Sequence, residues 1–69
     1  MKKIDAYTFP YGKVTKRLIR ACDWLNDTYK GVWPKEWEFD YPEYWEMPKS
    51  IAFKLSSDEV DFIQDRVYN

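Results

Sequence analysis

The sequence of residues 12–30 is GKVTKRLIRACDWLNDTYK, and this stretch decides the expected fold. Its apolar side chains recur every three or four residues, so they share one face when successive residues are turned by about 100°, as in an α-helix. That stripe consists of Val14, Leu18, Ala21, Cys22, Leu25 and Tyr29. Gly31 follows where a left-handed cap belongs, and Pro34 prevents the helix from continuing. The pattern predicts an amphipathic helix over residues 12–30.

A second helix is predicted after residue 56. The spacing Ser56-x-x-Glu59 is typical of a capping box, in which each side chain binds the backbone N–H of the other residue. Acidic residues at positions 58, 59 and 61 complement the positive end of a helix dipole. We therefore expect a helix over about residues 57–67. Its core-facing side chains should be Val60, Ile63 and Val67.

Three short segments alternate between apolar and polar residues, which favours β-strands. They are residues 3–9, 37–41 and 50–55, and in the last of them Ile51, Phe53 and Leu55 are expected to point inward. Residues 42–46 are expected to form one helical turn with Pro42 at its first position. The resulting order is β-α-β-β-α. We expect an α+β fold, a three-stranded sheet with two helices packed on one face, in a single domain over residues 1–69.

The composition limits the chemistry that this chain can perform. It contains no His, which removes the commonest general base and the usual zinc ligand. Its single Cys22 forms neither an internal disulfide nor a thiolate metal site, and its place on the apolar stripe indicates a small buried hydrophobe. Two glycines do not make a phosphate-binding loop. We expect a protein that is not an enzyme and that holds no metal or cofactor.

The sequence also bears on where the protein works. No apolar run approaches the length of about 18 residues that indicates a membrane span. One cysteine does not support the disulfide framework of small secreted domains. We therefore expect no membrane partner and a cytoplasmic location, in the producing cell or in a cell that it infects.

Charge is divided along the chain, although the net charge is only −1. Residues 1–30 carry seven Lys or Arg against three Asp, a balance of +4. Residues 31–69 carry four Lys or Arg against nine Asp or Glu, a balance of −5. The two halves either attract each other or present two different faces to partners.

The basic half offers one candidate surface. Four cations follow the spacing i, i+3, i+4 and i+7 of a single helical face, and an indole lies at its edge: Lys13, Lys16, Arg17, Arg20 and Trp24. A ring beside guanidinium groups can stack with them or with nucleic-acid bases. This face is either an ordinary solvated surface or a nucleic-acid-binding site.

The acidic half offers the other candidate surface. Residues 33–47 are rich in Trp, Tyr, Phe and Met, the residues enriched at the centres of protein interfaces, and prolines stiffen the segment. The expected anchors are Trp37, Tyr41, Tyr44 and Trp45. Flanking carboxylates of Glu38, Asp40 and Glu43 are expected to set orientation and association rate.

Residues 47–63, MPKSIAFKLSSDEVDFI, resemble the opening strand and first helix of ribbon-helix-helix DNA-binding proteins. That resemblance implies a strand paired across a dimer in the major groove, with Ser50, Ala52 and Lys54 facing the bases. One Lys and one Ser make a poor groove reader, so we do not adopt this family.

The sequence as a whole favours a small protein-binding module. In size, aromatic content and divided charge, it is similar in type to the small accessory proteins with which bacteriophages disable host machinery, anti-CRISPR proteins among them. The resemblance implies an inhibitor that sterically blocks a nucleic-acid-handling enzyme or defence complex. One alternative is an accessory protein that binds nucleic acid directly through the basic helix face. Another is a homodimer joined through residues 37–41 or 50–55.

Overall fold

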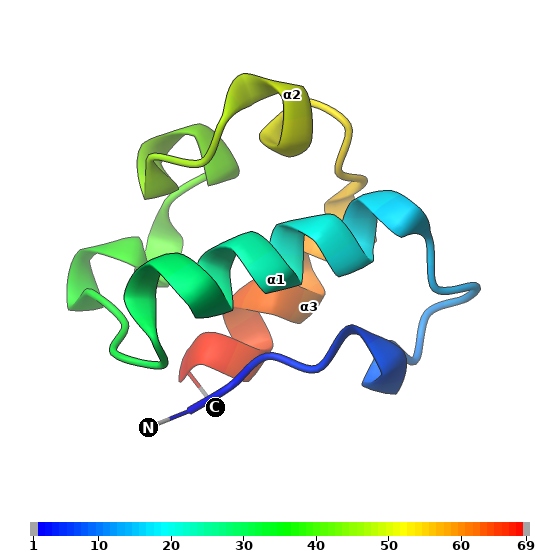
Figure 1. The fold of residues 1–69 in the computed structure, drawn as a ribbon, viewed down its shortest axis with the longest axis horizontal. Helices are drawn as coiled ribbons and strands as arrows, with labels where there is room; N and C mark the ends of the chain where they lie inside the picture. Colours follow the sequence, from blue (N-terminus) through cyan, green and yellow to red (C-terminus); the bar gives the residue numbers. More distant parts are fainter. Residues whose placement is uncertain (1, 69) are drawn as a thin grey trace.

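The computed structural model describes residues 2–68, which form three α-helices joined by 3-10 turns and irregular segments (Figure 1). The α-helices are α1 (Lys16–Tyr29), α2 (Lys49–Ala52) and α3 (Ser57–Tyr68). The 3-10 turns are η1 (Ala6–Thr8), η2 (Lys35–Phe39) and η3 (Pro42–Trp45). In Figure 1, α1 runs across the middle of the molecule, with α2 above it and α3 behind.

Helix α1 confirms the helix predicted over residues 12–30, with shifted ends. It begins later than expected because Thr15 is its N-cap, where the Thr15 hydroxyl accepts a hydrogen bond of 3.2 Å from the N–H of Leu18. The chain leaves the helix through Lys30, which is left-handed with a φ of 53°. Gly31 also has a positive φ, of 81°. Two successive left-handed residues therefore turn the chain, where one was predicted.

The core is a single cluster of buried side chains contributed by all three helices, the turns and the first residues. Its members are Ile4, Ala6, Leu18, Ala21, Cys22, Leu25, Trp37, Trp45, Met47, Ile51, Phe62, Ile63 and Val67. The predicted apolar stripe of α1 is largely confirmed, since four of its six members are in this cluster and Val14 and Tyr29 pack against it. Burial, and then the negative charges of Asp23, Asp5 and Glu59, raises the pKa of the Cys22 thiol to about 12.

The expected α+β fold is wrong, because residues 2–68 contain no β-strand. Residues 37–41 belong mostly to η2, and residues 50–55 to α2 and the turn after it. At α2 the carbonyl of Pro48 accepts hydrogen bonds from the N–H groups of Ile51 at 2.9 Å and Ala52 at 3.0 Å. These local bonds wind the chain into a helix instead of leaving its backbone free for a neighbouring strand.

Because these segments are helical turns and not strands, their side chains do not all point in the predicted directions. Ile51 is buried, but Phe53, also expected to point inward, is 90% exposed. Residues two apart share a face in a strand and diverge in a helical turn. The strand required by the ribbon-helix-helix resemblance is therefore missing from residues 50–55. The strands that were to join a homodimer are missing as well.

Two other local predictions are confirmed. Residues 42–45 form the single turn η3, with Pro42 at its start. The capping box is present at the start of α3: the N–H of Ser56 donates to Oε1 of Glu59 at 3.0 Å, and the N–H of Glu59 donates to Oγ of Ser56 at 3.3 Å. Of the predicted core face of α3, Ile63 and Val67 are buried and Val60 is half-buried.

Glu59 also joins the beginnings of α1 and α3, a contact that the capping box did not predict. Its carboxylate is buried and accepts hydrogen bonds from Oγ1 of Thr15 at 2.9 Å and from Nε of Arg17 at 2.7 Å. Burial by itself raises the pKa of Glu59, but the hydrogen bonds from Ser56, Arg17 and Thr15 outweigh it, so the pKa is lowered. We call these four residues the polar node.

The extended segment of residues 2–5 is held by the side chains of Asn26 and Trp33 and by the turn after α1, not by a sheet. The amide of Asn26 accepts a hydrogen bond from the N–H of Ile4 at 2.9 Å and donates one to the carbonyl of Ile4 at 2.8 Å. Nearby, the N–H of Lys2 donates to the carbonyl of Gly31 at 3.2 Å. Asn26 thus satisfies the backbone groups that a neighbouring strand would otherwise bind.

Candidate functional site: an acidic–aromatic groove

The aromatic middle segment divides into a buried part and an exposed part. Trp37 and Trp45 are buried and stack on each other, with 5.9 Å between ring centroids and 27° between ring planes. Tyr29 of α1 meets Trp37 edge-on, with 4.4 Å between centroids. Two of the four expected protein-binding anchors therefore lie in the core.

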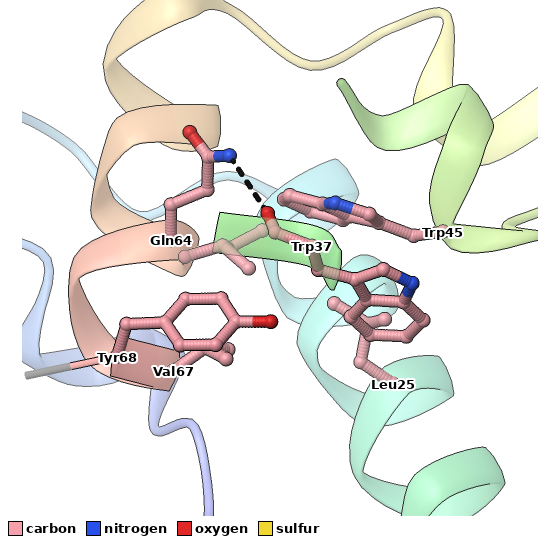
Figure 2. Close-up of a pocket in the computed structure, with 7 residues that line it drawn as sticks. Leu25, Trp37, Trp45, Gln64, Val67 and Tyr68 are labelled. Carbon is pink, nitrogen blue, oxygen red and sulfur yellow. Dashed lines mark hydrogen bonds between the residues drawn. The ribbon is translucent and has the colours of Figure 1, made fainter. Parts of the chain in front are cut away.

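Figure 2 shows the surroundings of these two indoles, with Leu25, Val67 and Tyr68 packed around them. The space that they enclose is too small for a water molecule, so it is well-packed core and not a ligand pocket. Tyr68 closes this side by donating a hydrogen bond from its hydroxyl to the carbonyl of Pro34. Within the described residues, Nε1 of Trp45 is buried without a hydrogen-bond partner.

Gln64 fixes the path of the segment that leaves this core. Its Nε2 donates to the carbonyl of Asp40 at 2.7 Å and to the carbonyl of Trp37 at 3.3 Å, and the second of these bonds is drawn in Figure 2. The carbonyl of Glu38 lies at 3.5 Å from the same nitrogen. One side chain of α3 therefore holds the end of η2 in place.

A groove of about 560 Å³ lies between this segment on one side and α2 and α3 on the other. Three rings on its lining are strongly exposed: Phe39 at 87%, Tyr41 at 66% and Phe53 at 90%. A single exposed apolar side chain is ordinary, but three large rings around one concave surface are typical of an interaction site.

The charged residues that line this groove are all acidic. They are Glu38, Asp40, Glu43 and Asp61. Within residues 2–68, no Lys or Arg side chain forms an ion pair with any of the four. The groove therefore combines exposed rings with uncompensated negative charge. We call the three rings and four carboxylates together the acidic–aromatic groove.

The structure brings together four of the seven predicted protein-binding residues. Tyr41, Glu38, Asp40 and Glu43 line the groove, whereas Tyr44 is exposed but outside it. The sequence analysis missed Phe39, Phe53 and Asp61 as site residues. Phe53 was missed because the false strand assigned it to the core. The proximity of Asp61 depends on how α3 packs against η2, which no local pattern contains.

The predicted basic face is largely dispersed. Lys13 precedes α1, and Arg17 is bound to Glu59. Lys16 and Arg20 remain exposed beside a hollow of about 470 Å³, which Asp23 and Trp24 also line. Trp24 is half-buried and meets Tyr29 edge-on, with 6.1 Å between centroids. Two cations next to a carboxylate make a smaller positive surface than the four-residue stripe suggested.

Two further findings concern the described part of the chain. Among residues 2–68, no three Cys, Asp or Glu side chains are grouped so that they could hold a metal ion. Over the same residues, none of the helices is both long enough and apolar enough to span a lipid bilayer.

Comparison with known proteins gives no relative. No protein-family model matches the chain, and neither a curated protein nor a solved structure is significantly similar to it. The function is therefore inferred from the chemistry of the groove itself.

Proposed function

We propose that this protein is a non-enzymatic protein-binding module that sterically inhibits or modulates a nucleic-acid-handling enzyme or defence complex. Small proteins that bacteriophages direct against their hosts act in this general way. The acidic–aromatic groove is the observation that carries the proposal, because it offers apolar anchors and a uniform charge on one concave surface.

The apolar part of the groove supplies the affinity. Full burial of a Phe side chain contributes about 1.5–3 kcal/mol, and Phe39 and Phe53 are 87% and 90% exposed in the protein alone. A partner that covers both rings therefore gains most of this free energy on binding. Gln64 already holds one wall of the groove, so less ordering entropy is lost when the partner binds.

The acidic part of the groove indicates the kind of partner. Enzymes that handle nucleic acid carry clustered Lys and Arg where the phosphate backbone binds. Four carboxylates that form no ion pair within the described residues attract such a surface and accelerate its association. A module bound there sterically excludes the nucleic acid.

The proposal is tested by affinity capture from a nuclease-treated bacterial lysate. The baits are wild type, the groove variant Phe39→Ser/Phe53→Ser, and the control Tyr7→Ser/Val32→Ser, which alters two exposed apolar residues outside the groove. Wild type and control should recover the same nucleic-acid-handling enzyme, and the groove variant should recover it at least about tenfold less. Equal recovery by all three baits, or recovery without any such enzyme, would contradict the proposal.

Direct nucleic-acid binding is the competing function, supported by the hollow beside Lys16, Arg20 and Trp24. It requires wild type to bind a labelled oligonucleotide at about 50 mM salt, with affinity falling steeply as salt rises. It also requires Lys16→Ala/Arg20→Ala to lose this binding and the groove variant to keep it. An absence of binding at low salt would remove this alternative.

A further inference from the structure

The groove alternates two kinds of group that few single ligands satisfy together. Its exposed rings, Phe39, Tyr41 and Phe53, offer flat faces, and its four carboxylates offer paired oxygen acceptors. An apolar side chain would use the rings and leave the carboxylates to be desolvated without partners, which is costly. An ammonium group would satisfy a carboxylate but remains compact and strongly hydrated.

The arginine side chain fits both kinds of group. Its guanidinium is planar, stacks on aromatic faces and donates two parallel hydrogen bonds to one carboxylate. The chain contains one such guanidinium–ring contact, where the guanidinium carbon of Arg66 lies 5.3 Å from the ring centroid of the buried Phe62. The same chemistry is therefore accessible to the rings of the groove.

The volume of the groove limits how much of an occupant it can enclose. One turn of an α-helix with its side chains occupies about 500 Å³, from a rise of about 5.4 Å and a diameter of about 10–12 Å. The groove holds about 560 Å³, so it receives the side chains of a docked segment and does not enclose a whole folded element. The end of η2 that forms one wall is already fixed by Gln64.

We propose that the acidic–aromatic groove binds an arginine-bearing segment of its protein partner, and that it discriminates arginine from lysine. Guanidinium groups stack on Phe39 and Phe53 and pair with the neighbouring carboxylates. This inference rests on the proposed function and names the chemistry of the partner. Segments of this kind bind phosphate backbones, so the module and the nucleic acid compete for the same arginines.

Fluorescence anisotropy with labelled hexa-arginine and hexa-lysine peptides in about 150 mM salt tests this inference. Hexa-arginine should bind about fivefold more tightly, which corresponds to one exposed cation–π contact of about 1 kcal/mol. Phe39→Leu and Phe53→Leu should lower the arginine affinity more than the lysine affinity, because a planar guanidinium loses stacking as well as its cation–π contact, whereas an ammonium loses only the cation–π contact. Asp40→Asn/Asp61→Asn should weaken both peptides about equally.

Two matched variants outside the groove serve as controls. Tyr7→Leu and Asp27→Asn change an exposed ring and an exposed carboxylate, and neither should alter binding of either peptide. Both Phe positions are almost fully exposed, so thermal unfolding of the Leu variants should match that of wild type. This match would separate a lost contact from a lost fold.

The outcomes distinguish this inference from the proposed function. Equal affinities for the two peptides, or loss of binding in the controls, would overturn the arginine preference. No binding of either peptide would overturn the arginine-bearing occupant. In each case the proposed function would still stand if Phe39→Ser/Phe53→Ser had lost the captured enzyme. Self-association of wild type in sedimentation, lost in Phe53→Ser, would assign the groove to a second copy of the chain and overturn the inference.

Discussion

Different interactions hold the two ends of α1 in place: hydrogen bonds at the first turn and aromatic packing at the last. At its first turn, the polar node joins it to α3 through short hydrogen bonds from Thr15 and Arg17 to Glu59. At its last turn, Tyr29 packs into a cluster of indoles from the middle segment, centred on Trp37. The polar end depends on one ionised carboxylate, whereas the aromatic end depends on buried area. The polar end therefore fixes the geometry of the contact between α1 and α3, and the aromatic end contributes stability through buried ring area.

The largest effect is expected from breaking the aromatic end. Trp37→Ala should lower the free energy of unfolding by about 3–5 kcal/mol, because it leaves a cavity between Tyr29 and Trp45. That is a large part of the total of about 3–10 kcal/mol expected for a domain of this size. Urea denaturation followed by circular dichroism measures it. Trp33→Ala removes a half-buried indole of the same cluster and should cost less. The opposite order would contradict the central place of Trp37.

Substitution of Glu59 in the polar node should cause the second largest loss of unfolding free energy. Glu59→Ala should cost about 2–3 kcal/mol, because the N–H of Ser56 and the Thr15 hydroxyl lose a buried acceptor. Asp58→Ala is the matched control, since it removes an exposed carboxylate from the same turn and should cost only about 0.3–1 kcal/mol. Equal losses in the two variants would show that the node acts only through the helix dipole.

The stability contributions of the two ends of α1 should depend differently on pH. The folded-state pKa of Glu59 lies below its ordinary value of 4.5, so the stability that it contributes is complete above about that pH. This contribution is lost as pH falls through the lowered pKa. The stability difference between wild type and Glu59→Gln, measured by urea denaturation from pH 7 downward, should therefore shrink below about pH 4.5. The cost of Trp37→Ala should not follow this profile. A parallel decline of both differences would contradict the assignment to Glu59.

The smallest effect is expected at Trp45. Trp45→Phe removes buried ring area, but it also removes the N–H that has no hydrogen-bond partner within the described residues. These changes oppose each other, so the net cost should stay below about 1.5 kcal/mol. Thermal unfolding measures it. A cost similar to that of Trp37→Ala would contradict the absence of a hydrogen-bond partner for the indole nitrogen within the described residues.

This contrast also explains which elements could be predicted from the sequence. Helices α1 and α3 have apolar periods over several turns, and their caps are local: Thr15 binds the N–H of Leu18, and Ser56 exchanges hydrogen bonds with Glu59. Such signals depend on residues three or four apart. The link from Glu59 to Thr15 and Arg17 spans more than 40 residues of sequence, so the capping box predicted only half of the node.

Strands were wrongly predicted in segments where a short alternating pattern fits a helical turn as well as a β-strand. Residues 37–41 alternate rings with carboxylates, as a strand with two faces would. In the structure Trp37 is buried while Phe39 and Tyr41 are exposed, because prolines at 34 and 42 confine the segment to one short turn. Three of the four carboxylates of the groove, those of Glu38, Asp40 and Glu43, were predicted from their density in the sequence. The exposure of Phe53 follows from the helical turn at α2 and was not predicted.

The burial of the Cys22 thiol means that its rate of alkylation measures how often the core opens. With its pKa near 12 and its side chain 1% exposed, Cys22 should not react with an alkylating reagent while the chain is folded. Each alkylation therefore records an opening of the core around Cys22. The ratio of this rate to that of a free cysteine gives the fraction of time that the core spends open. A ligand of the groove that binds only the closed form would slow this reaction, although the thiol lies outside the groove.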